Sequence, residues 1–303
     1  MNGTSHDSVQ HRVRFDFEIE FTNGGGIQGQ DFRLDIDGDD IADAALVDYI
    51  VQDLRLLMVG QARILNKAII VEAHKRKGEA ADPGRRVYVD LSHTIEDGLV
   101  TYPGMPAARV CDYLSREASR AIYEEGTEFQ IVRIEMVANT GTYIDCPSHR
   151  YAHGHDLAGL RPEACADLEG IVIRADHRQV NAIDASWFRD KEIRGRAVLV
   201  HTGWDAHWAD PSYAVGHPFL TEDAAVYLRD CGVKLVGIDS MNIDDTRGRA
   251  RPVHSTLLGA DILIVEHLRN LAALPDQGFS FSAVPPKVRG AGTFPVRALA
   301  RLD

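Results

Sequence analysis

The chain has 303 residues, of which 33 are lysine or arginine and 45 are aspartate or glutamate, so its formal net charge is −12 with 13 neutral histidines. This length allows one large domain or two smaller ones, and an apolar share of 45% is that of a globular protein with a filled core. The charge argues against a duplex nucleic-acid binder, which needs a basic face, and no apolar run approaches the roughly 20 residues of a membrane helix.

The beginning of the sequence and the cysteines predict the compartment. Residues 1–17 carry charges throughout and contain no apolar core of a secretory signal. The 4 cysteines lie far apart without a CxxC pair, which is typical of reduced thiols and not of disulfides or a zinc–thiolate site. We therefore expect a cytoplasmic protein.

Residues 1–80 predict a small α+β unit with the element order ββαβ. Apolar residues alternate with charged ones over 13–21 and again over 32–36, and the glycine-rich turn 23–26 lies between them. Such alternation on both sides of a turn is typical of a β-hairpin with one apolar face. A unit this short is about as small as an independent domain can be.

An amphipathic pattern over 41–58 predicts a helix, with Asp39 or Asp40 as its N-terminal cap, and 63–71 predicts a returning strand. The stretch 72–86 is charged and contains glycine and proline but few apolar residues. This composition is typical of a linker. We expect the boundary of the small unit near residue 80, followed by a larger domain that begins at residue 87.

Residues 87–303 alternate strand and helix patterns. Strands are expected at 87–91, 129–137, 171–175, 197–201, 233–238 and 262–265. A helix is expected from Thr221, as its N-cap, to Cys231, with Gly232 as the stop signal. Asp239 and Glu266 directly follow two of the strands. Strand–helix–strand units with polar residues after the strands predict an α/β layer whose site lies at the strand ends.

The densest group of polar residues is 139–149, which we expect to follow a strand and to begin a loop. Gly141 permits a sharp turn and Pro147 stiffens the exit. Asp145 and His149 are close enough to point into one cavity, and a carboxylate with an imidazole can bind a metal or serve as an acid–base pair. A turn with a surface histidine is the alternative interpretation.

A second pair of candidates is His254 and Glu266. Glu266 comes directly after four apolar residues, where a carboxylate must be paired, hydrated or bound to a metal. A salt bridge to an arginine is an equally good interpretation. Cys146 lies beside Asp145, but without a matching cysteine–histidine pattern we expect a small packed thiol.

From residue 87 to the end, the chain resembles the metal-dependent cyclase family, which includes bacterial kynurenine formamidase and isatin hydrolase. The matching segments follow in the family's order, at 90–93, 102–104, 140–149, 198–204, 217–220, 233–240, 254–258, 264–266 and 295–297. The resemblance implies a swivelling β/β/α domain that hydrolyses amides, lactams or related C–N bonds with a metal-bound water. The N-terminal unit lies outside this resemblance.

The family motif His-x-Gly-Thr-His-x-Asp-x-Pro-x-His falls on residues 139–149. Asn139 and Tyr143 replace its first two histidines, whereas Asp145 and His149 match. In the family, the two replaced histidines and the aspartate hold one metal. An amide and a neutral phenol are poor ligands for a zinc-like ion, so we expect this metal site to be lost.

The family's second metal is held by the aspartate together with a later histidine and glutamate, whose positions here are His254 and Glu266. The resemblance therefore assigns one divalent metal to Asp145, His254 and Glu266, and the proton shuttle to His149. One imidazole and two carboxylates suit Zn²⁺, Mn²⁺ or Fe²⁺ with open positions for water and substrate. A site without any metal is the other possibility.

The expected function is hydrolysis of a C–N bond in an amide, formamide or lactam, or of a related ester, in a small-molecule substrate. Under this hypothesis Tyr143 is catalytic, because its hydroxyl can donate to a developing oxyanion. Asn139 would touch the substrate, and Tyr102 and Trp204 would line an apolar pocket. The family resemblance also favours a homodimer or homotetramer.

Two alternatives are left open. A metal-independent cyclase or lyase of a biosynthetic pathway would use Tyr143, Asp145 and His149 for acid–base chemistry. A non-catalytic binding protein on the same fold would explain why two ligand positions are lost. The presence of Asp145, His149, His254 and Glu266 together argues against this last alternative.

Overall fold

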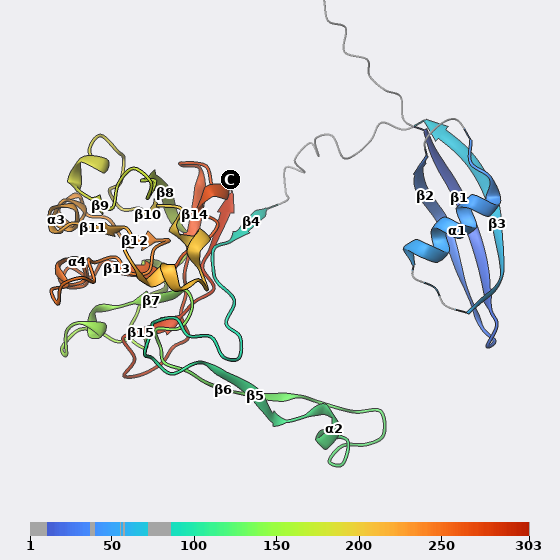
Figure 1. Ribbon diagram of the computed structural model, residues 1–303, viewed down its shortest axis with the longest axis horizontal. Helices are drawn as coiled ribbons and strands as arrows, with labels where there is room; N and C mark the ends of the chain where they lie inside the picture. The colour runs from blue at the N-terminus through green and yellow to red at the C-terminus, as the bar shows by residue number, and fades with distance from the viewer. Residues whose placement is uncertain (1–10, 37–39, 55, 57, 72–85, 303) are drawn as a thin grey trace, which may run out of the picture. The chain divides into compact units, whose positions relative to one another are not determined.

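The computed structural model describes residues 11–36, 40–54, 56, 58–71 and 86–302. The chain divides into two compact units, residues 1–85 and 86–303 (Figure 1). The linker predicted over 72–86 lies outside the described residues except for Arg86. Among the described residues, no helix combines the length and apolar character that crossing a bilayer requires.

The first unit is a three-stranded antiparallel sheet with one helix. Its elements are β1 (His11–Phe21), β2 (Gly26–Ile36), α1 (Asp43–Asp53) and β3 (Val59–Val71), and the strand order is β2-β1-β3. The alternation along β1 buries Val13, Phe15, Phe17 and Ile19 on one face. These side chains form a core with Leu46 and Ile50 of the helix, because a strand with period-2 alternation has one apolar side to cover.

The helix α1 is shorter at both ends than the predicted 41–58, and the predicted cap is wrong. The N-cap position is Ala42, without a side-chain cap. Asp40 lies 3.6 Å from the Lys67 ammonium, which also pairs with Asp43 at 2.8 Å. The Asp40 carboxylate therefore lies beside Lys67 of β3. Asp39 lies outside the described residues.

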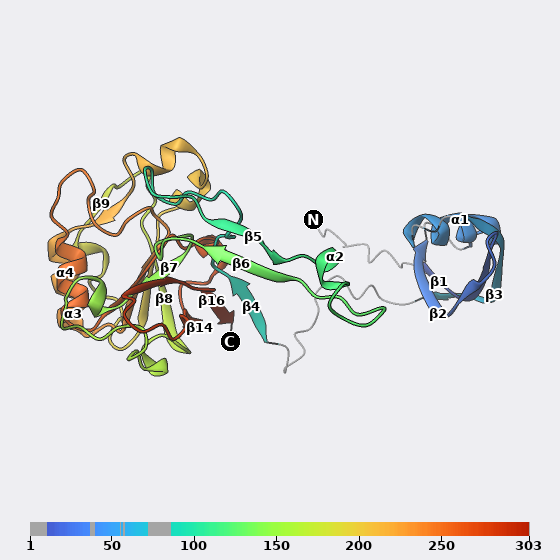
Figure 2. The same cartoon turned by 90° about the horizontal axis from the view of Figure 1, so that it is seen from below.

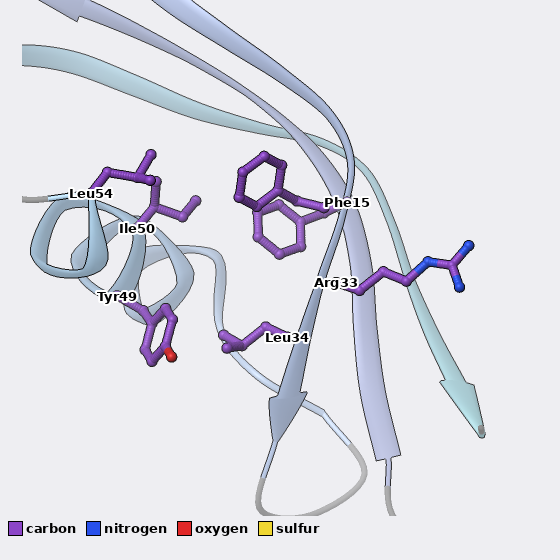
Figure 3. A pocket seen from close by; sticks show the side chains of 7 residues that line it. Phe15, Arg33, Leu34, Tyr49, Ile50 and Leu54 are labelled. Atoms are coloured by element: carbon purple, nitrogen blue, oxygen red, sulfur yellow. The ribbon is translucent and has the colours of Figure 1, made fainter. Parts of the chain in front are cut away.

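A pocket of about 130 Å³ is lined by residues of both α1 and the sheet. Figure 3 shows Phe15 and Leu34 on the sheet side and Tyr49, Ile50 and Leu54 on the helix side, while the Arg33 side chain points away from the helix. The lining is mainly apolar, so the helix and the sheet belong to one small hydrophobic core.

The second unit is built on a nine-stranded mixed sheet with the order β15-β7-β13-β12-β10-β8-β14-β16-β4. Its strands are β4 (Val87–Asp90), β7 (Tyr143–Asp145), β8 (Leu168–Arg174), β10 (Ala197–His201), β12 (Leu235–Ile238), β13 (Leu263–Glu266), β14 (Phe279–Ser282), β15 (Thr293–Pro295) and β16 (Leu299–Leu302). The four strands β8, β10, β12 and β13 are parallel, and the outer strands run antiparallel to their neighbours.

Helices and short turns lie beside this sheet, except α2, which lies at the far end of the ribbon of β5 and β6 (Figures 1 and 2). They are α2 (Arg116–Ser119), α3 (Glu222–Cys231), α4 (Pro252–Leu258) and the 3-10 helices η1 (Pro147–His149), η2 (Pro162–Ala164), η3 (Ala185–Trp187), η4 (Trp204–His207), η5 (Pro211–Ala214) and η6 (Leu271–Ala273). Two small ribbons pair β9 (Ala182–Ile183) with β11 (Phe219–Leu220), and β5 (Arg109–Leu114) with β6 (Ile131–Glu135). The helix α3 ends at Gly232 in the left-handed region, as predicted.

The central strands are buried on both faces. The sheet has one hydrophobic core on each face. In β10, Ala197 and Leu199 belong to the first core, and Val198 and Val200 belong to the second, which also contains side chains of α3 and α4 (Figure 1). Layers on both sides explain why these strands are continuous apolar runs in the sequence. The mixed α/β architecture confirms the predicted fold class.

A candidate metal and catalytic site at one end of the sheet

The register of three neighbouring strands gathers the first site residues. Tyr143 and Asp145 lie in the short strand β7, so this part of the predicted loop is in fact a strand. Glu266 of β13 pairs with Tyr143, and Thr293 of β15 pairs with Asp145. Because paired residues and residues two apart share one face of a sheet, these four side chains meet on the same side.

The turn before β7 needs a glycine. Gly141 has φ +65, and a Cβ atom there would lie 3.0 Å from Cγ1 of Ile95. The neighbouring Thr142 is buried and its hydroxyl donates to the backbone oxygen of His267 at 2.5 Å. The turn therefore fixes the start of β7, and with it the position of Tyr143.

Glu266 is fully buried and accepts hydrogen bonds from two donors, while the Tyr102 hydroxyl lies further away and has closer partners in Tyr143 and the Met241 backbone oxygen. The Tyr143 hydroxyl donates to its Oε2 at 2.5 Å, and the Tyr102 hydroxyl lies 3.4 Å from the same atom. The backbone N–H of Ile243 donates to Oε1 at 2.6 Å. Burial raises the pKa of Glu266 to about 7 against the opposing effect of His254. Burial also raises the pKa of Tyr143 well above its ordinary value, so the phenol is a neutral donor.

His254 comes from α4 and is oriented by Asp244. The Asp244 carboxylate accepts from the backbone N–H groups of Val253 at 2.8 Å and His254 at 3.0 Å, so it caps the start of α4. It also lies 2.6 Å from Nδ1 of His254. This bond places the proton on Nδ1 and turns Nε2 toward the site, as second carboxylates do for metal-binding histidines.

Asp145 has one oxygen engaged and one left without a partner. Its Oδ1 accepts from the Thr293 hydroxyl. Its Oδ2 is buried without a hydrogen-bond partner, and lies 3.6 Å from Nε2 of His254, which is too long for a hydrogen bond. A buried carboxylate oxygen without a partner is costly, and in this position it faces an imidazole nitrogen and a second carboxylate.

The 3-10 helix η1 brings His149 to the rim of the same cluster. Its Nδ1 lies 2.7 Å from the Thr293 hydroxyl, and its side chain is 35% exposed. The Thr293 proton is already donated to Asp145, so Nδ1 of His149 must be the donor to Thr293 and Nε2 is left as a free base. Gly292 allows this contact, because a Cβ atom there would lie 2.3 Å from the His149 backbone nitrogen.

The cluster carries excess buried negative charge. Three carboxylates, those of Asp145, Asp244 and Glu266, are fully buried around the single imidazole of His254. Within residues 86–302, no lysine or arginine forms an ion pair with them. Burial opposes the His254 cation, but the carboxylates of Asp145 and Asp244 outweigh it and raise the histidine's pKa to about 10.

These residues fit a divalent metal. Candidate ligand atoms of Asp145, His149 and His254 all lie within 4.8 Å of one another, a group that contains His149 and not the predicted Glu266. Glu266 approaches it through His254, whose Nε2 lies 3.7 Å from Oε1 of Glu266. Two donors that share a zinc-like ion lie roughly 3–4 Å apart, because each is about 2.0–2.2 Å from the ion. The partnerless Oδ2 of Asp145 and the excess negative charge are what such an ion would satisfy.

The structure also places the residues predicted to contact the substrate. Tyr102 is hydrogen-bonded to Tyr143 at 2.7 Å and packs against a small cluster that contains Trp204, Tyr213 and Met241. Trp204 is 9% exposed and donates its Nε1–H to the Tyr213 backbone oxygen at 3.0 Å. Asn139 is half-buried in the bend before β7, without a hydrogen bond to another described residue. The Cys146 thiol is buried, as expected.

Sequence reasoning missed two residues of the site, Asp244 and Thr293. The sequence around Asp244 indicates a site residue only weakly: Asp244 follows the polar end of a buried strand and precedes Pro252, which begins α4. No local pattern indicates Thr293, because it meets Asp145 only through a strand pairing across 148 positions of sequence.

The fold of the second unit is similar to that of solved hydrolase structures. Isatin hydrolase A from Labrenzia aggregata, in complex with benzyl benzoate, superposes with a TM-score of 0.60 at 22% identity, over 72% of this chain and 94% of that one. A structure described as a potential metal-dependent hydrolase with cyclase activity gives a TM-score of 0.58 at 25% identity, over 72% of this chain and 99% of that one.

Sequence similarity then gives the family. The family described as "Putative cyclase" matches residues 89–245. The chain is 25% identical over 215 residues to the kynurenine formamidase of Maricaulis maris, over 70% of this chain and 96% of the relative. It is 24% identical over 215 residues to the kynurenine formamidase of Bacillus cereus strain ATCC 14579, a match that covers 71% of this chain and 97% of the relative. The chain belongs to the cyclase family and is a hydrolase.

Proposed function

We propose that the chain hydrolyses a C–N bond of a small amide, formamide or lactam with the help of one divalent metal ion. The observation that carries this proposal is the buried, partnerless Oδ2 of Asp145, which faces His254 within a group of three buried carboxylates that share this one imidazole. The names of similar proteins support this proposal, because a formamidase cleaves the C–N bond of a formamide and an isatin hydrolase hydrolyses isatin.

Asp145, His254 and Glu266 would hold the ion. A bound divalent metal lowers the pKa of a water molecule and polarises a carbonyl group. Asp244 keeps Nε2 of His254 turned toward the ion through the 2.6 Å bond to Nδ1. Asn139 and Tyr143 are poor ligands, which supports one ion per chain and not two.

His149 would move the proton. Its Nδ1–H is held by the Thr293 hydroxyl, so its free Nε2 can take the proton of the attacking water and return it to the leaving nitrogen. The water oxygen forms the new bond to the carbonyl carbon, the C–N bond breaks, and the amine leaves with the proton that His149 carried. The 35% exposure of His149 lets it reach a substrate at the rim.

Tyr143 and Tyr102 would support the carbonyl end. Burial keeps both hydroxyls neutral at neutral pH, with pKa values well above the ordinary one. A neutral hydroxyl in a buried site can donate to an oxygen on which negative charge develops. The Tyr143 proton is donated to Glu266, so this role requires the phenol to exchange that bond for one to the substrate. The cluster of Trp204, Tyr213 and Met241 beside Tyr102 supplies an apolar wall for a ring-containing substrate.

The test is turnover of a panel of aryl formamides, lactams and aryl esters by the protein loaded with Zn²⁺, Mn²⁺ or Fe²⁺. We expect hydrolysis of at least one C–N substrate, loss after chelation, and recovery with one equivalent of metal. His149→Ala should lower kcat by 10²–10⁴, the usual share of a general acid–base group. His153→Ala, an exposed histidine outside the cluster, is the matched control.

Full activity of the His149→Ala variant would contradict the assignment of His149 as the proton shuttle. Activity that survives chelation in a protein free of metal would instead favour acid–base chemistry by Tyr143, Asp145 and His149 alone. Hydrolysis of esters without any C–N substrate would contradict the proposed bond type.

A further inference from the structure

A separate pocket of the second unit lies at the carboxyl ends of β8 and β10. Its volume is about 510 Å³, and small-molecule sites usually have about 300–1,000 Å³. We call it the β8–β10 pocket. It is lined by residues that end or follow these two strands and by one residue of η3, among them Arg174, Asp176, His177, Arg178, Trp187 and His201.

The strand register separates this pocket from the candidate metal site. Arg174 ends β8 and pairs with His201, which ends β10. The carboxyl ends of parallel strands are the usual place for ligands in open α/β sheets. The strand β12 lies between β10 and β13, so β10 is roughly 10 Å from the strand that carries Glu266. None of the described residues that line the pocket belongs to the proposed metal ligands.

Arg174 sets the tautomer of His201. Its guanidinium donates to Asp276 at 2.9 Å and to the backbone oxygens of Leu271 at 3.1 Å and Leu274 at 2.5 Å, which fix its position. Its Nη1 also lies 3.1 Å from Nδ1 of His201. Because an arginine can only donate, this Nδ1 accepts and the ring proton is on Nε2. Burial and the charge of Arg174 lower the pKa of His201, so the ring is neutral at neutral pH.

His177 has the opposite tautomer. Its Nδ1 lies 2.9 Å from the backbone oxygen of Thr202, which can only accept, so Nε2 of the neutral ring is left as an acceptor. Thr202 is itself held by the buried Asp239, which accepts from its backbone N–H at 2.8 Å. Among the described residues, Nε2 of His177 and Nε2 of His201 have no hydrogen-bond partner, and neither atom is buried. The pocket thus offers one free N–H and one free ring acceptor.

Arg178 and Trp187 add a charged edge and an aromatic wall. Asp176 accepts from Nε of Arg178 at 2.9 Å and from Nη2 at 2.5 Å. This pair positions the guanidinium and leaves Nη1 without a partner among the described residues, and arginine N–H groups bind carboxylates well. Trp187 is half-buried against the core that also contains α3 and α4. Its flat ring favours stacking with another planar ring.

The unsatisfied groups indicate the chemistry of the ligand. The free N–H groups of His201 and Arg178 require an acceptor. The pocket lining has two arginines against one aspartate, in a chain whose net charge is −12, so an anion is favoured there over most of the surface. Asp276, the partner of Arg174, is 70% exposed and does not line the pocket.

We propose that the β8–β10 pocket binds a planar aromatic carboxylate, with the carboxylate on Arg178 and His201 and the ring against Trp187. The free Nε2 of His177 accepts from a hydroxyl or amino group of the same ligand. The walls are held in place by bonds to groups outside the pocket, so little ordering is required on binding. This binding does not depend on the proposed hydrolysis.

The test is the affinity of the full chain for cinnamate, measured by calorimetry and by ligand-observed NMR. Metal is first removed with a chelator, so that the carboxylate has no ion to bind at the candidate metal site. We expect one site per chain with a Kd below about 1 mM. Cinnamamide, which has the same ring without the charge, should bind at least about tenfold more weakly, because it lacks the charge-assisted bonds.

Arg178→Gln should weaken cinnamate binding roughly 10–100-fold, the usual effect of losing a hydrogen bond to a charged group. Arg178 is 78% exposed, so this variant keeps the fold. Arg229→Gln is the matched control, because Arg229 is an exposed arginine of α3 that also pairs with an aspartate. It should keep the wild-type affinity, as should His149→Ala.

Three results would overturn the proposal. The first is no binding of cinnamate by either method up to about 5 mM. The second is equal affinity for cinnamate and cinnamamide, which would contradict an anion site. The third is wild-type affinity in Arg178→Gln, and loss of binding in His149→Ala would then place the ligand at the candidate metal site.

Discussion

Two buried histidines lie just behind the site and are not used by the proposed chemistry. His93 stacks on Trp208 with ring centroids 3.9 Å apart, and His267 lies next in sequence to Glu266. The Nε2 atoms of both are buried without a hydrogen-bond partner. Burial, helped by the charge of Arg269, lowers the pKa of His93 to about 3, and burial lowers that of His267 well below its ordinary value. Both rings are therefore neutral in the folded protein.

This neutrality predicts acid sensitivity. Below about pH 6.5 the unfolded chain protonates His93, whereas the folded chain does so only near pH 3, so stability falls as the pH drops through this window. Each such histidine contributes up to about 1.4 kcal/mol per pH unit. His93→Gln should flatten the dependence of the urea-unfolding free energy on pH between 7 and 5 by that amount. His153→Gln is the control, and an unchanged slope in His93→Gln would contradict the prediction.

At the scale of elements, the site depends on the short helix α4. Asp244 accepts hydrogen bonds from the first turn of α4 and also orients the imidazole of His254. One side chain therefore positions both the start of the helix and a proposed metal ligand. Neighbouring Asp245 faces solvent and pairs with Arg247.

This coupling predicts different effects of two adjacent substitutions. Asp244→Asn should weaken metal affinity by about 10–100-fold, the usual effect of removing a carboxylate that orients a metal-binding histidine. Asp245→Asn should leave the affinity within about twofold of wild type. Titration calorimetry with Zn²⁺ or Mn²⁺ measures both. Equal affinities in the two variants would show that Asp244 only supports the fold.

The elements also show what the sequence predicts well. The strands β8, β10, β12 and β13 are continuous apolar runs because both of their faces are covered, and this pattern is visible locally. The strand β7 has only three residues, and the preceding Gly141 and Thr142 together with its own Asp145 predict a loop. Its strand conformation comes from pairing with β13 and β15, which no local pattern records.

The same distinction holds for the site. Asp145, His149, His254 and Glu266 could be proposed from their residue types and their place in a family motif. The contacts that tune them could not, because Tyr143 and Thr293 reach Glu266 and Asp145 through strand pairing, and Tyr102 reaches Tyr143 from a loop 41 positions away. The late start of α1 likewise lies beside a tertiary contact, the ion pairs of Lys67 with Asp40 and Asp43.

At the scale of the molecule, the two units have separate cores, and all candidate site residues belong to the second. A chain shortened to residues 86–303 should therefore keep its fold, its metal affinity and its kcat within about threefold. Circular dichroism, metal titration and turnover of the substrate found for the full chain measure this. A collapse of turnover in a folded and metal-loaded shortened chain would assign the N-terminal unit a part in the active enzyme.

The strand order has a consequence for how the enzyme becomes active during folding. Thr293 of β15 meets Asp145 across 148 positions, and Tyr143 meets Glu266 across 123. Contacts this distant in sequence carry a large loop-closure cost and form slowly. Turnover should thus return after the recovery of secondary structure when the unfolded chain is diluted into buffer, and the delay would time the docking of β15 against β7.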